Sequence, residues 1–149
     1  PRRSSDLKWA STLIGKVTED QGGRFSLSAG ISSYPFRDYK KPEIARNCMK
    51  ALLHGTFFGP GSSVVFDSLS LNVSGDAYFG ESDLSAAVKD YRKGLELDPH
   101  DVNLLNSLGV AYANLLGVAI ALGVVMTWHL LGRPFAPKTD GVPSSSSGT

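Results

Sequence analysis

Apolar positions recur with two different periods along the first 67 residues. Between residues 7 and 19 they lie three or four positions apart, which predicts an amphipathic helix. From Phe25 to Ile31 apolar residues alternate with Ser and Gly, which predicts a half-buried strand. A second helix is expected from Pro42 to Phe57, because proline is favoured in a first helical turn. A short strand at Val64 to Phe66 completes a helix–strand–helix–strand order, which is typical of an α/β unit.

From Ser68 onward the pattern predicts helices alone. The first runs from 68 to 80 and the second from 84 to 97, with a third from 102 to about 115. Asp83 and Asp101 precede the second and third helices as N-caps, since an aspartate oxygen accepts from the first free backbone N–H groups. The apolar stripe of the second helix, which we expect to be buried, consists of Leu84, Ala87, Val88, Tyr91 and Leu95.

Two of these helices carry the same short pattern at a spacing of about 34 residues. Leu71 to Tyr78 aligns with Leu105 to Tyr112, and each segment has a glycine four positions after its leucine. With Ala87 between them, this pattern resembles the tetratricopeptide repeat (TPR), whose period is 34. The resemblance implies antiparallel helical hairpins. Gly75 and Gly109 should then lie where two helices approach most closely.

The TPR resemblance also implies a function, namely binding of a protein or peptide partner without catalysis. In that family the first helix of each repeat lines a concave groove. The candidate peptide-binding residues on these helices are Asn72, Asp76, Asn103 and Asn106. An asparagine amide can donate to and accept from a peptide backbone, although the alternative of simply solvated asparagines stays open. The basic residues with which some members bind a terminal carboxylate are missing, so such a ligand is not expected.

A second resemblance concerns roughly residues 7–67. The segment from Phe25 to Pro35, followed by a helix and a glycine-rich turn before Val64, is similar to the C-terminal half of GGDEF (diguanylate cyclase) domains. Arg24 stands where that family needs acidic residues, and without carboxylates no Mg²⁺ can be held against triphosphate oxygens. This resemblance therefore implies a degenerate, non-catalytic remnant. The alternative function is a role in nucleotide signalling with cyclic di-GMP.

The last helical segment lacks the polar face of the others. From Val102 to Gly132 there is no Asp, Glu, Lys or Arg, and residues 115–131 are almost wholly apolar. Because Ala121 lies 34 residues after Ala87, we expect a closing helix that docks on the preceding repeat and on a second copy, giving a homo-oligomer. A membrane anchor through residues 115–131 is the alternative that is not favoured. A segment without selected function is a third possibility.

Charge and composition exclude several classes of function. The chain of 149 residues has a net charge of +1 and no extended Lys/Arg cluster, so nucleic acid is not an expected partner. Cys48 is the single cysteine, which fits a reducing, cytoplasmic location. The three histidines are scattered, and His54 and His100 are expected on the surface. No metal, cofactor or catalytic residue is therefore predicted.

The expected fold class is α+β, with a small α/β unit followed by antiparallel TPR-like helical hairpins. The three predicted parts are a partial GGDEF-like segment at 1–67, TPR-like repeats at 68–134 with an unusually apolar last helix, and a disordered tail at 135–149. Because Pro1 is not a natural start, we expect a fragment of a larger bacterial signalling or scaffold protein.

Overall fold

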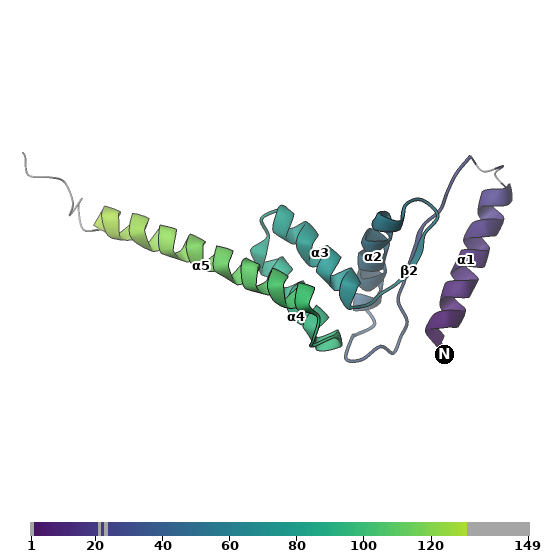
Figure 1. Cartoon of the computed structure of the whole chain (residues 1–149), viewed down its shortest axis with the longest axis horizontal. Coiled ribbons are helices and arrows are strands. Elements are labelled where there is room, and N and C mark those ends of the chain that lie inside the picture. Colours follow the sequence, from purple (N-terminus) through teal and green to yellow (C-terminus); the bar gives the residue numbers. More distant parts are fainter. Residues whose placement is uncertain (1, 21, 23, 131–149) are drawn as a thin grey trace, which may run out of the picture. The chain divides into compact units, whose positions relative to one another are not determined.

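The computed structural model describes residues 2–20, 22 and 24–130, and the tail expected at 135–149 lies outside them (Figure 1). Most of the described residues are helical. The elements in chain order are α1 (Arg2–Asp20), β1 (Ala29–Ile31), α2 (Glu43–Gly55), the 3₁₀ turn η1 (Thr56–Phe58), β2 (Ser63–Val65), α3 (Ser68–Gly80), α4 (Leu84–Leu97) and α5 (Val102–Leu130).

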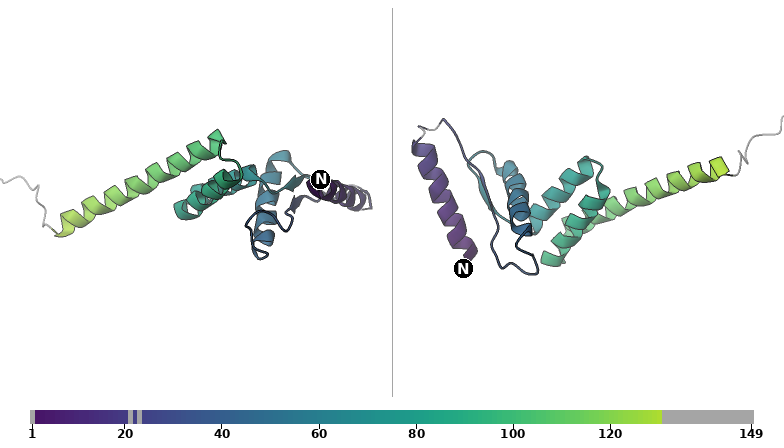
Figure 2. Two further views of the ribbon diagram at one scale, coloured as in Figure 1. Left: turned by 90° about the horizontal axis from the view of Figure 1, so that it is seen from below. Right: turned by 180° about the vertical axis from the view of Figure 1, so that it is seen from behind.

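The two strands form a small parallel sheet. Ala29 pairs with Ser63 and Ile31 with Val65, and the Phe66 N–H donates to the Ile31 carbonyl at 2.7 Å. Helices α1 and α2 both pack against the sheet, which lies between them in Figures 1 and 2. The helix–strand–helix–strand order that the sequence predicts is confirmed.

The first strand is shorter than predicted. The alternating pattern begins at Phe25, yet only Ala29–Ile31 form β1, and residues 24–28 are exposed. β1 is short because its partner strand β2 offers only three residues for pairing. A strand needs a neighbour to satisfy its backbone groups, so the unpaired half of the alternating segment remains irregular.

Helix α2 approaches β1 at a glycine. A Cβ atom on Gly30 would lie 1.9 Å from the backbone oxygen of Cys48, so no larger residue fits without moving the helix. The adjoining core contains Phe66, whose ring meets the rings of Phe36 and Tyr39 edge to face at 6.0 and 5.6 Å. Leu71 of α3 is fully buried in the same cluster. Residues on both sides of position 67 thus share one core. The predicted boundary between the part at 1–67 and the part at 68–134 stays a prediction.

Helix α5 corrects the prediction of a helix that ends near Leu115. It continues without a break to Leu130. No proline occurs where the turn was expected, and Asn114, which is a favoured capping residue type, instead donates to the Val110 carbonyl within the helix at 2.9 Å. The boundary between the two compact units of the chain falls inside this helix, between Leu115 and Leu116.

Candidate functional site

The predicted N-caps of the helical hairpin are present. The Asp83 carboxylate accepts from the Ala86 N–H at 3.0 Å and from the Ser85 hydroxyl, and these bonds hold the pKa of Asp83 below its usual range. The Asp101 carboxylate accepts from the N–H groups of Asn103 and Leu104 at 2.9 and 3.2 Å. Each cap satisfies donors that the first turn of a helix leaves free, so the starts of α4 and α5 are fixed by local sequence.

Helices α3 and α4 pack closely at Gly75. A Cβ atom there would lie 2.4 Å from the ring of Tyr91, which is 1% exposed, so the predicted close contact is confirmed. A second close contact, which sequence reasoning missed, lies between α4 and α5. There a Cβ on Gly94 would lie 2.8 Å from the Leu104 side chain. The fully buried Ala87 and Ala111 complete this core.

The prediction for Gly109 is wrong. A Cβ atom on this residue would have no neighbour within 4 Å. By the 34-residue register, Gly109 corresponds to Gly75, which faces Tyr91 of the following helix. Because α5 does not turn back after Leu115, the described part of the chain provides no such helix opposite Gly109.

The hydroxyl of Tyr91 joins three helices. It donates to Asp76 Oδ1 of α3 at 2.7 Å, and the side chain of Ser107 on α5 hydrogen-bonds to it as well. Burial of the ring and the neighbouring Asp76 carboxylate raise the pKa of Tyr91 above its ordinary value. The phenol therefore stays neutral and fixes the relative position of α3, α4 and the first half of α5.

The structure separates the four predicted peptide-binding residues. Asn72 is 7% exposed and its Oδ1 atom lacks a hydrogen-bond partner within the described chain, so this side chain is not open to a peptide. Asp76 is exposed and accepts from Tyr91. Asn103 and Asn106 are exposed on α5, and their side chains make no hydrogen bond to the described residues.

The first half of α5 presents two different exposed sides next to its buried stripe. The stripe contains Leu104 and Ala111, with Ser107 and Leu108 partly buried. One side carries Asn103, Asn106 and Val110, which we call the amide face. The other side carries Leu105, Gly109 and Tyr112, which we call the apolar flank. At the 34-residue spacing the apolar flank corresponds to Leu71, Gly75 and Tyr78 of α3.

A buried polar cluster between α2, α3 and α4 was not predicted from the sequence. Lys50 of α2 forms an ion pair with Asp90 of α4, and the Ser74 hydroxyl donates to the other Asp90 oxygen at 2.7 Å. Burial lowers the pKa of Lys50, although Asp90 opposes that shift. Asp90 is 4% exposed. An ionised pair can remain in such a place because its partners replace the lost water.

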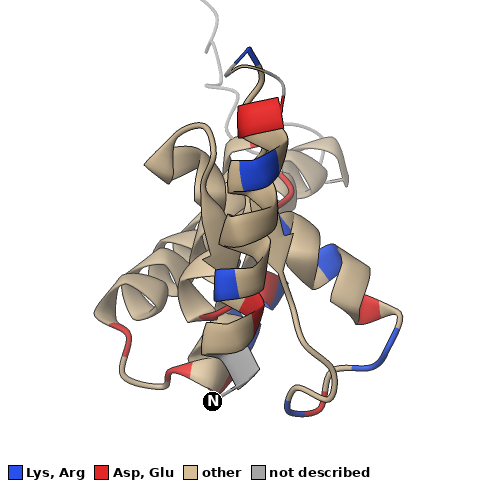
Figure 3. Ribbon diagram, turned by 90° about the vertical axis from the view of Figure 1, so that its right-hand side faces the viewer, with Lys and Arg blue, Asp and Glu red and all other residues tan. Residues whose placement is uncertain are grey.

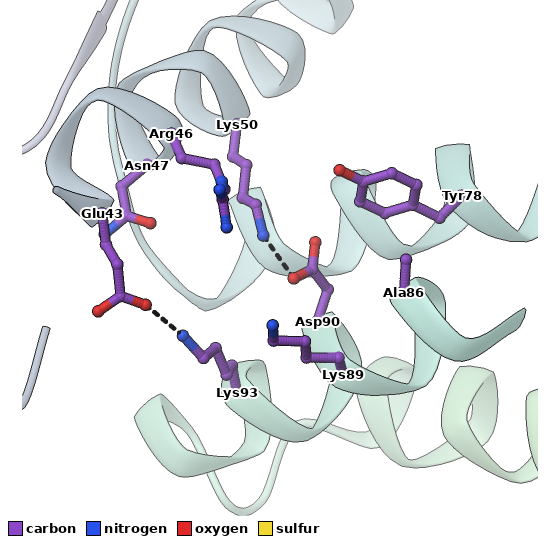
Figure 4. A pocket seen from close by; sticks show the side chains of 9 residues that line it. All are labelled: Glu43, Arg46, Asn47, Lys50, Tyr78, Ala86, Lys89, Asp90 and Lys93. Atoms are coloured by element: carbon purple, nitrogen blue, oxygen red, sulfur yellow. Dashed lines mark hydrogen bonds and ion pairs between the residues drawn. The ribbon is translucent and has the colours of Figure 1, made fainter. Parts of the chain in front are cut away.

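Next to this pair lies a pocket of about 180 Å³ (Figure 4). At its rim Glu43 and Lys93 pair at 2.7 Å, and the Lys93 ammonium lies 4.9 Å from the centre of the Tyr39 ring. Burial, followed by the negative charges of Glu96 and Glu43, raises the pKa of Tyr39 to about 12. The two carboxylates of this cluster, Asp90 and Glu43, are each paired with a lysine. The cluster is best described as a polar joint that holds α2 to the α3–α4 hairpin.

His54 corrects another prediction. It was expected on the surface, but it is 5% exposed, and its Nδ1 atom lies 3.2 Å from the hydroxyl of Ser70. The signal that could have found the joint is the spacing of Asn47, Lys50 and His54, which are three and four residues apart. They therefore share one side of α2. This side faces the hairpin, whereas the apolar side faces the sheet.

Metal chemistry finds no support in the described residues. None of them form a group of three or more His, Cys, Asp or Glu that could hold a metal ion. Cys48 is half-buried. Figure 3 shows acidic and basic positions interspersed along the ribbon.

Comparison with known proteins supports one part of the chain. The family model of the TPR repeat matches residues 75–115, which comprise the second half of α3, all of α4 and the first half of α5. No curated protein and no solved structure matches the chain. The packing at Gly75 and Gly94 lies within the matched segment. Residues 75–115 are thus similar to the TPR repeat, in sequence and in the helical hairpin they form.

Proposed function

We propose that the chain is a non-catalytic protein-binding module whose contact surface is the amide face of α5. TPR repeats generally mediate protein–protein interaction, and the matched segment contains this face. The observation that carries the proposal is the state of Asn103 and Asn106. Both amides are exposed, and their side chains make no hydrogen bond to the described residues, on a helix whose neighbouring stripe is buried, so they are free to bind.

An extended peptide is the ligand that this surface fits. Each amide group can donate to a backbone carbonyl and accept from a backbone N–H. Val110, which is 45% exposed, follows on the same side of α5 and adds apolar area for a side chain. Asp76 is held in place by Tyr91 and adds an exposed carboxylate from α3. The surface therefore favours an extended peptide whose backbone hydrogen-bonds to the two amides and which carries one small apolar side chain.

Peptide selection followed by substitution tests this proposal. Peptides are selected from a random library against the full chain in detergent micelles, and their affinity is measured by fluorescence polarisation. The double variant Asn103→Ala, Asn106→Ala removes two to four hydrogen bonds of about 1 kcal/mol each, so we expect binding to weaken at least about 10-fold. Arg92→Ala, on the exposed side of α4, is the control and should bind normally. Equal affinity of the double variant and the control would refute the proposal.

For residues 7–67 we propose a non-catalytic remnant of a GGDEF-like domain in a larger cytoplasmic signalling protein. Its support is the parallel pair β1 and β2 between α1 and α2, together with the glycine-rich turn before β2. Titration calorimetry with GTP and with cyclic di-GMP is the test. No heat of binding is expected for either nucleotide. Saturable binding of either one would favour the alternative role in nucleotide signalling.

A further inference from the structure

The second part of α5 has the length and composition of a membrane span. The helix contains no Asp, Glu, Lys or Arg from Val102 to Leu130. Residues 111–130 make about 20 helical positions, or about 30 Å, which equals the hydrocarbon thickness of a bilayer. We propose that residues 111–130 cross a lipid bilayer and anchor the protein-binding unit to it. The proposal does not depend on which partner the amide face binds.

The first argument is that apolar residues lie on every side of this segment. Successive residues such as Val124, Val125 and Met126 point in different directions around the helix, and each is more than half exposed. Only 6% of the most apolar window is buried within the described structure. A helix in contact with water keeps one polar face, whereas a helix that is apolar all round needs cover on all sides.

The second argument weighs against the docked closing helix that the sequence alone favoured. In the 34-residue register, the exposed charged positions of α4 are Lys89, Arg92 and Glu96. The positions 34 residues later are Gly123, Met126 and Leu130. If the segment folded back as a second hairpin helix, its outer side would present apolar residues to water. The preceding repeat and a second copy would each cover one side of the helix, whereas a bilayer covers all sides.

The third argument comes from the polar side chains inside the segment. The Asn114 amide donates to the Val110 carbonyl at 2.9 Å, and the Thr127 hydroxyl donates to the Gly123 carbonyl at 2.8 Å. One N–H of the Asn114 amide and the Thr127 hydroxyl are therefore satisfied within the helix, which lowers the cost of placing these side chains in hydrocarbon.

The ends of the segment also fit a bilayer. Tyr112 and Trp128 lie near its two ends, where the amphipathic rings of tyrosine and tryptophan favour the interface. Asp98 and Asp101 precede the apolar run, and Arg133 follows it in the sequence, so charged residues bound it on both sides. The length of residues 111–130 thus matches the thickness of the lipid hydrocarbon, and the residue types at the two ends match the membrane interfaces.

Flotation of the full chain with vesicles tests the proposal. The chain is reconstituted with phosphatidylcholine and phosphatidylglycerol vesicles, washed with alkaline carbonate and centrifuged through a sucrose gradient. We expect it to float with the lipid, and residues 111–130 to survive protease digestion. Leu122→Arg places a charge in the middle of the span and should reduce the floating fraction at least tenfold. Leu53→Arg, an equivalent change on the exposed side of α2, should float like the unaltered chain.

The contrary results are equally clear. Aggregated chain stays at the bottom of the gradient, and a soluble oligomer formed through the apolar segment stays in the aqueous fraction. Finding the unaltered chain at the bottom of the gradient or in the aqueous fraction overturns the proposal. Digestion of residues 111–130 in floated vesicles, or normal flotation of Leu122→Arg, overturns it as well, because the chain would then adhere to the lipid by another segment.

Discussion

At the scale of single residues, two glycines in equivalent repeat positions have opposite surroundings. Gly75 leaves no room for a Cβ atom against the Tyr91 ring, whereas Gly109 has open space around it. Both lie within helices, where alanine is favoured over glycine by about 1 kcal/mol. The same substitution should therefore have opposite effects at the two sites.

Gly75→Ala should destabilise the chain, because overpacking against a buried ring costs about 1–3 kcal/mol and outweighs the gain in helix propensity. Gly109→Ala should stabilise it by up to about 1 kcal/mol. Thermal unfolding followed by circular dichroism in detergent micelles measures both. If Gly109→Ala lowers the melting temperature as much as Gly75→Ala does, α5 has a partner helix that the structure does not contain.

These residues also show what the sequence can predict. The contact at Gly75 follows from a local repeat pattern, and so do the caps at Asp83 and Asp101. The exposure of Gly109 does not follow from the repeat pattern, because it depends on whether the chain turns back near Leu115, 6 residues later. The burial of Asn72 and His54 depends on the packing of α2 against α3, which no local pattern within α3 indicates.

At the scale of elements, the attachment of α2 to the hairpin depends on a buried ion pair. Removing the charge of Lys50 would leave the Asp90 carboxylate, which is 4% exposed, with only the Ser74 hydroxyl as partner. A buried charge without its counter-ion is strongly unfavourable, whereas a partly exposed pair contributes little. The Glu43–Lys93 pair at the rim provides the comparison within the same joint.

Lys50→Met should therefore lower the free energy of unfolding by about 3–5 kcal/mol, while Lys93→Met should change it by about 1 kcal/mol or less. Urea unfolding of the full chain in detergent measures both variants. The double variant Lys50→Met, Asp90→Leu is the control, since it removes both charges and should recover much of the loss. Equal effects of the two single lysine variants would contradict the burial of the joint.

Elements were predicted well where local signals decide and poorly where a distant partner decides. The starts of α4 and α5 follow from Asp83 and Asp101, which lie next to the helix starts and cap them. The strand β1 is shorter than its alternating pattern because its length is set by β2, more than 30 residues away. Helix α5 continues without interruption because no proline occurs within it.

At the scale of the whole molecule, we propose that the protein combines a TPR-like protein-binding surface with a helix that crosses a bilayer. The two roles are assigned to different halves of α5. The amide face of the first half is polar and ends at Val110, and the proposed span begins at Ala111. A partner bound at the amide face would therefore be held close to the membrane surface.

The central claim is that the amide face of α5 is the contact surface for a protein partner, and photo-crosslinking tests it most directly. A benzophenone amino acid is placed at position 110 of the full chain in vesicles, or at position 92 as the control. Peptides selected against the unaltered chain are then added and irradiated. We predict crosslinks from position 110 and none from position 92. Crosslinks from position 92 alone, or from neither position with a peptide that binds, would contradict the account.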